Sequence, residues 1–65
     1  MTFPEILKEI MIEQSLNQVK LSKMTGLKQG HISDWLLGKS QPNYDSLKIL
    51  CKILQESADR LLGLK

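Results

Sequence analysis

Apolar residues recur along this chain at intervals of three and four, the spacing that places side chains on one face of a helix. Leu7, Ile10 and Met11 show it near the start, and Leu47, Leu50 and Leu54 show it again near the end. No stretch alternates as a strand would, and there is no internal repeat. We therefore predict an all-α fold in a single domain over residues 1–65, with helices at about 3–14, 18–25, 28–37, 44–55 and 58–63.

Polar residues and glycines mark where these helices begin and end. A short side chain with an oxygen favours the first position of a helix, because it accepts a hydrogen bond from a free N–H group there. Glycine favours the residue after the last turn, where the backbone becomes left-handed, and Gly26 and Gly38 lie at such points. We predict N-caps at Thr2, Asn17, Asn43 and Ser57.

Residues 18–35 carry the most informative part of this pattern. Leu21 is predicted to face inward from the first of two short helices and Ile32 from the second. Gly26 ends the first helix, and Ser22 is small enough to let the two helices approach closely. This arrangement is typical of a helix-turn-helix, whose second helix enters the major groove of DNA.

Composition narrows the class of protein. A chain of 65 residues buries only about 60% of its unfolded surface, so its core must be well packed. With Cys51 as the single cysteine and His31 as the single histidine, neither a disulfide nor a zinc site is expected, nor is any other cofactor. The unpaired thiol and the absence of a membrane span or signal peptide lead us to expect a cytoplasmic protein.

The net charge of +2 says less than its distribution does. Residues 1–15 hold one Lys and three Glu, residues 16–43 hold four Lys and one Asp, and residues 44–65 hold four basic and three acidic residues. The positive excess therefore falls on the predicted helix-turn-helix and the loop after it, where a phosphate backbone would lie. Chance scatter of surface charge is the alternative explanation.

Apolar, small and glycine positions keep a fixed spacing from residue 16 to residue 42: Leu16, Gln18, Leu21, Ser22, Gly26, Leu27, Ile32, Ser33, Trp35, Gly38, Lys39 and Pro42. Together with the closing segment 57–64, this spacing resembles the Xre/Cro family of phage repressors and their bacterial relatives. The resemblance covers roughly residues 5 to 64. It implies a compact, five-helix, lambda-repressor-like bundle that binds operator DNA, usually as a two-fold dimer.

The chain departs from the family pattern at four points. The family commonly pairs an Arg with a Glu where this chain has Met11 and Leu36, so we expect those two side chains to make an apolar contact instead. Lys28 replaces the usual Ser or Thr cap of the recognition helix. Gly30 stands where many relatives carry a base-reading side chain. The dipeptide at residues 55–56, Gln-Glu, replaces a common Gly-apolar pair.

The exposed start of the second helix of the motif supplies the candidate base-reading residues. Gln29 is the strongest, because its amide can pair with both N6 and N7 of adenine. Trp35, at helical spacing from Ile32, is predicted to lie in the core and not to stack on bases. The positions expected to face the bases are Gln29, Gly30, His31, Ser33 and Asp34.

Phosphate contacts are expected on either side of that helix. Gln18 begins the first helix of the motif, where free N–H groups can meet a phosphate. Lys39 and Ser40 lie in the following loop, which in relatives holds the backbone with main-chain N–H groups and a basic side chain. The candidate set is Asn17, Gln18, Lys28, Lys39 and Ser40.

These residues favour a sequence-specific DNA-binding regulator, in particular a repressor that blocks polymerase by occupying double-stranded operator DNA. The alternative is a protein-interaction or antitoxin module on the same fold, which Gly30 and the modest net charge keep open. No enzyme is expected, because no nucleophile–base pair is visible. No small-molecule ligand and no membrane partner are implied.

A single recognition helix reads few base pairs, so we expect a homodimer on DNA, with half-sites about 34 Å apart. Leu64 is a candidate for its interface, because it lies beyond the helix-ending Gly63. The alternative is that Leu64 folds back onto its own core. The predicted dimer contacts are Leu54, Gln55, Glu56, Leu61 and Leu64.

Overall fold

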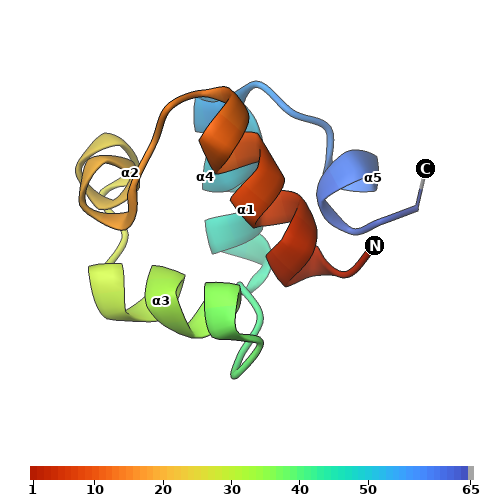
Figure 1. Ribbon diagram of the computed structural model, residues 1–65, viewed down its shortest axis with the longest axis horizontal. Helices are drawn as coiled ribbons and strands as arrows, with labels where there is room; N and C mark the ends of the chain where they lie inside the picture. The colour runs from red at the N-terminus through yellow and green to blue at the C-terminus, as the bar shows by residue number, and fades with distance from the viewer. Residues whose placement is uncertain (65) are drawn as a thin grey trace.

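The computed structural model describes residues 1–64, and within them the chain forms five helices and no strand (Figure 1). The all-α prediction is therefore confirmed, and each helix lies where the hydrophobic spacing placed it. The helices are α1 (Phe3–Glu13), α2 (Gln18–Thr25), α3 (Gln29–Leu37), α4 (Tyr44–Leu54) and α5 (Ala58–Leu61). No helix among these residues is long and apolar enough to cross a membrane.

Helix α1 runs through the middle of the molecule, with α4 behind it in the view of Figure 1 and α3 below it. It packs against α3 and α5, while α4 packs against α2 and α5. Every helix contributes to one core, in which Trp35 is only 3% exposed, as the helical spacing predicted. The core residues are Ile6, Leu7, Ile10, Met11, Leu21, Ile32, Trp35, Leu50, Leu54 and Leu61.

Three of the four predicted N-caps form as expected. Asn17 Oδ1 accepts from the Lys20 N–H at 2.8 Å, and Asn43 Oδ1 accepts from the Ser46 N–H at 2.8 Å. Ser57 Oγ accepts from the Arg60 N–H at 3.1 Å. Each bond satisfies a donor that has no partner within its own helix.

Thr2 begins α1 in a different way. Its hydroxyl donates to Glu5 Oε1 at 2.7 Å, and its backbone N–H donates to the same oxygen at 3.1 Å. The side-chain hydrogen bond from Thr2, followed by the backbone one, lowers the pKa of the Glu5 carboxyl. The charge of Glu5 also lies in the first turn, where it complements the helix dipole.

The ends of the helices follow the glycine pattern except after α1 and α4, where the non-glycine residues Ser15 and Gln55 have a positive φ. Gly26 and Gly38 adopt left-handed backbones with φ of 76° and 77°. Helix α4 ends at Leu54, one residue before the predicted end, because Gln55 takes a left-handed φ of 57° without being a glycine. Gln55 therefore adopts the left-handed backbone expected of the glycine that relatives carry before the last helix.

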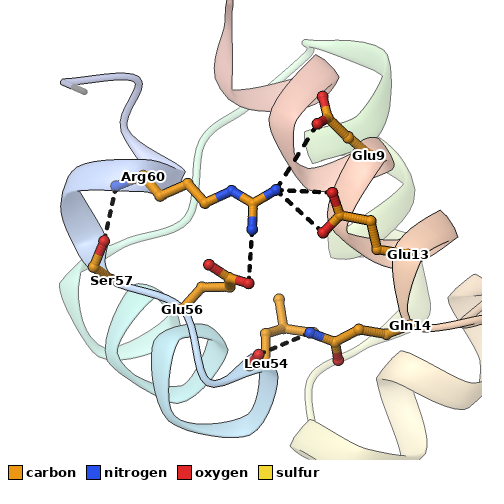
Figure 2. Close-up of polar contacts among 7 residues, drawn as sticks. All are labelled: Glu9, Glu13, Gln14, Leu54, Glu56, Ser57 and Arg60. Atoms are coloured by element: carbon orange, nitrogen blue, oxygen red, sulfur yellow. Dashed lines mark hydrogen bonds and ion pairs between the residues drawn. The ribbon is translucent and has the colours of Figure 1, made fainter.

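A polar cluster around Arg60 fastens α5 to α1 (Figure 2). The guanidinium donates to Glu56 Oε2 at 2.8 Å and to both oxygens of Glu13 at 3.0 and 3.1 Å, with Glu9 Oε1 at 3.9 Å. The hydrogen bonds that Arg60 donates to Glu56 and then to Glu13 raise the pKa of its guanidinium. Nearby, Gln14 Nε2 donates to the Leu54 carbonyl at 2.8 Å and satisfies the last turn of α4.

Candidate nucleic-acid interface

The turn between α2 and α3 brings the two helices of the motif together over the core. Leu21 and Ile32 are fully buried at the crossing, as predicted. Ser22 Oγ donates to the Leu27 carbonyl, so its side chain faces inward and also makes a hydrogen bond. Leu27 packs against the core as the residue that directs the chain back into the protein. The helix-turn-helix geometry is thus built from the residues whose spacing predicted it.

The first half of α3, the helix that lies below α1 in the view of Figure 1, is rich in polar residues. Gln29, Gly30 and His31 are exposed, whereas Ser33 and Asp34 are half-buried on the flanks of the helix. Within residues 1–64, the Gln29 amide and the His31 ring make no hydrogen bond or ion pair. Their donors and acceptors are therefore available to an outside partner.

Gly30 leaves open space on this surface. A Cβ atom built at this residue would meet no other atom within 4 Å. The glycine is therefore not required by packing inside the domain.

A hollow of about 210 Å³ lies between α3 and the start of α4. His31 and Ser40 both line it. These two predicted DNA contacts are nine residues apart in the sequence. Three polar residues that the sequence did not single out as contacts also line it: Gln41, Asn43 and Ser46. Only the way the loop 38–43 folds against α3 reveals them.

The residues predicted to contact phosphates differ in which of their polar groups remain available for such a contact. Lys28, Lys39 and Ser40 are exposed, and neither lysine has a carboxylate within ion-pair distance in the part of the chain described. The Asn17 Oδ1 is already engaged in capping α2, which leaves only its amide NH2 group to donate to a phosphate. The Lys39 N–H donates to the Asp34 carbonyl at 2.9 Å, so Lys39 offers only its side chain and not the main-chain contact expected from relatives.

Met11 and Leu36 line one groove, together with Leu16 and the exposed Ile12 and Leu37. Met11 is 5% exposed, and Leu36 packs against the core. This shared environment agrees with an apolar contact where relatives have an ion pair. The same groove reaches Asn17 and Gln18 at the start of α2.

The predicted dimer contacts divide into available and unavailable side chains. Leu54 and Leu61 are 1% and 0% exposed within a single copy, so they belong to its own core and cannot offer a contact surface. The Glu56 carboxylate is held by Arg60. Gln55 and Leu64 are exposed, and the 70% exposure of Leu64 shows that the alternative, in which it folds back onto its own core, is wrong.

Sequence reasoning missed the cluster around Arg60. One signal for it was present, because Glu56 and Arg60 are four residues apart, the spacing of a helical ion pair. The contact with Glu13 joins residues 47 positions apart and carries no such local signal. Cys51 is half-buried against the core, and this burial raises the pKa of its thiol.

Comparison with known proteins gives a consistent result. A family model described as helix-turn-helix matches residues 7–61. The chain is also 34% identical over 63 residues to an HTH-type transcriptional activator, BcrR, of Enterococcus faecalis. The match covers 97% of this chain but only 31% of that relative, so the chain spans about a third of its length. No solved structure matches significantly.

Proposed function

Because the chain belongs to the helix-turn-helix family, we propose that it is a DNA-binding transcriptional regulator that reads a specific operator with α3. The observation that carries this proposal is the outer face of α3, where Gln29 and His31 are exposed and their side chains make no hydrogen bond or ion pair within the described chain. Exposed donors and acceptors at the start of a helix that are not hydrogen-bonded within the protein can pair with the edges of bases in the major groove.

Gln29 reads a base in this proposal, with adenine as the best match for its amide. His31, Ser33 and Asp34 complete the set that approaches the bases. Gly30 allows close approach of the helix backbone, since no side chain stands between it and the groove.

Lysine side chains on either side of α3 hold the phosphate backbone. Lys28 lies before the helix and Lys39 after it, with Ser40 beside Lys39. The N–H groups at the start of α2, at Gln18, supply a further contact of the kind that positions a protein without reading sequence.

Repression by occupancy is the proposed outcome, because a domain seated in the major groove over a promoter excludes polymerase. A segment similar to this chain occurs in BcrR, which is named as an activator. Whether the proposed regulator represses or activates therefore depends on where its operator lies relative to the promoter. A reporter with the selected site placed over the promoter, or upstream of it, distinguishes the two signs.

We also propose that two copies of the chain bind a two-fold operator. They would lie on one face of the DNA, in half-sites about 34 Å, or one helical turn, apart. The surface for this contact is the turn at Gln55 and the exposed Leu64, which its neighbours within one copy do not cover. Footprinting and sedimentation on a selected site test it. A one-to-one complex on a single half-site, unaffected by Leu64→Glu, would rule out the dimer.

The central experiment selects bound duplexes from random DNA and repeats the binding at two salt concentrations. A consensus sequence and a steep fall of affinity with salt are expected, because phosphate contacts release counterions. The second candidate function, a protein-interaction module, is favoured by the small net charge of +2 and by Gly30 on the reading face. Weak binding with no consensus supports it instead.

Two variants then separate base contacts from phosphate contacts. Gln29→Ala should weaken specific binding by about 1–3 kcal/mol and relax preference at one base position. Lys39→Ala should weaken binding to all sequences alike and flatten the slope of log K against log salt by roughly one unit. If the two variants gave the same profile, the division of roles proposed here would be wrong.

A further inference from the structure

We propose that Ser22 and Thr25 are positioning residues for DNA reading: their hydroxyls, both from α2, hold the backbone of Leu27 and so fix where α3 begins. This inference rests on the proposed function, because α3 is the reading helix there. We call this arrangement the Leu27 clamp, made of the two hydroxyls and the N–H and carbonyl of Leu27.

Both backbone polar groups of Leu27 are engaged by these side chains. Ser22 Oγ donates to the Leu27 carbonyl, and Thr25 Oγ1 accepts from the Leu27 N–H at 3.1 Å. Leu27 is the second residue before α3, and its side chain packs against the core. A residue held at both of its backbone polar groups and at its side chain has little conformational freedom left.

Thr25 connects the clamp to the rigid part of the fold. Its hydroxyl also donates to the Leu21 carbonyl at 2.8 Å, and the side chain of Leu21 is fully buried. One hydroxyl therefore bridges the backbone of a core residue to the backbone of the turn. The left-handed Gly26 between them lets the chain reverse so that this bridge can form.

Among the described residues, α3 lacks the side-chain cap that begins α2, α4 and α5. Asn17, Asn43 and Ser57 cap α2, α4 and α5 with side-chain hydrogen bonds, but Lys28 at the start of α3 makes none. The helix then has a glycine at its second residue, Gly30, which lowers its intrinsic stability. The first hydrogen bonds of α3 are accepted by the Lys28 carbonyl, directly after the clamped Leu27.

This arrangement frees the cap position for another use. A capping residue must be short, and a cation at the start of a helix is electrostatically unfavourable. With the turn fixed from α2, Lys28 can instead place a long basic side chain beside the exposed start of α3, where DNA would lie. The clamp thus replaces the cap and leaves Lys28 for a phosphate.

Hydrogen exchange in the free protein tests the clamp without DNA. The His31 and Ile32 amides, which donate to the Lys28 carbonyl at 3.1 and 3.2 Å, report on the first turn of α3. Ser22→Ala, which removes one hydrogen bond, should speed their exchange by about fivefold. Thr25→Val, which removes the bonds to both Leu27 and Leu21, should speed it at least as much. Thr2→Ala is the control, because it also removes one side-chain hydrogen bond at a helix start, on α1.

DNA binding gives the second measurement, on a duplex selected by the wild-type protein. Each clamp variant should weaken binding about fivefold and narrow the discrimination between the selected site and single-base variants. Thr25→Ser, which keeps the hydroxyl, should restore both properties. Thr2→Ala should leave both unchanged at temperatures where circular dichroism shows the variants to be folded.

Rescue by a new cap distinguishes positioning from general stability. Lys28→Asn gives α3 an N-cap of its own, so Ser22→Ala should have a much smaller effect on His31 and Ile32 exchange in that background. An equal effect in both backgrounds, or one no larger than that of Thr2→Ala, would overturn the proposal. If the wild-type protein selects no DNA sequence, the proposed function fails, while the exchange experiment still decides the clamp.

Discussion

Helices α3 and α4 follow each other in the chain but begin in opposite ways. Helix α4 starts with Asn43, whose side chain accepts from the Ser46 N–H at 2.8 Å, and has an acidic Asp45 in its first turn. Helix α3 starts with Lys28, which makes no cap, and continues through Gly30. Each choice in α4 favours the helix, whereas both choices in α3 oppose it.

The difference is that the helix start with the weaker local preferences is the one that we propose to meet DNA. Residues that violate helix preferences without a structural reason tend to mark functional sites. Gly30 has no atom near its would-be Cβ, so packing does not demand it. The start of α3 is thus the part of the domain least explained by folding alone.

The largest effect is expected at the far end of α3, where the core holds it against α1. Met11→Arg buries an unpaired charge at a side chain that is 5% exposed, and should destabilise the protein by about 3 kcal/mol or more. Adding Leu36→Glu should recover part of that loss in thermal denaturation. Simple additivity of the two changes would show that residues 11 and 36 do not pair.

The comparison is tested directly by removing the N-cap of α4 and by giving α3 an N-cap. Asn43→Ala should cost about 1 kcal/mol of unfolding free energy, because it removes a cap. Lys28→Asn should add a similar amount while weakening DNA binding, because a cap replaces a cation. Chemical denaturation and binding measured on the same samples check this, and a Lys28→Asn protein with stronger DNA binding would contradict it.

A smaller effect is expected at the glycine of α3. Gly30→Ala should raise the unfolding free energy by about 0.5–1 kcal/mol, since the helix gains propensity and the new methyl meets nothing within 4 Å. The same variant should weaken operator binding if the backbone of α3 approaches the bases closely. A melting temperature that falls instead would mean that Gly30 has a structural role.

The smallest effect is expected far from α3, at the start of α1. The pKa of Glu5 is lowered by its hydrogen bonds to Thr2, so the charged form favours folding. Its contribution is present above the ordinary value of 4.5 and is lost as the pH falls through the lowered value. Glu5→Gln should therefore flatten the loss of stability below pH 4.5, measured by denaturation across that range.

Local patterns in the sequence determined most of the fold. The apolar spacing fixed the five helices because each must bury one face, and short polar residues fixed the starts of α2, α4 and α5 because an acceptor there satisfies free N–H groups. The exposure of Gln29 and the burial of Ile32 and Trp35 follow from the same helical period. These features depend on neighbours within four residues.

Contacts between distant residues were decided only by the tertiary structure. Arg60 reaches Glu13 across 47 residues, and Leu54 and Leu61 are core residues although a reading of the chain end made them surface contacts. The Lys39 N–H is likewise turned inward, to the Asp34 carbonyl, which only the path of the loop reveals. The physical reason is that hydrophobic spacing shows which face of a helix is buried, while the side chain opposite it depends on how all five helices pack together.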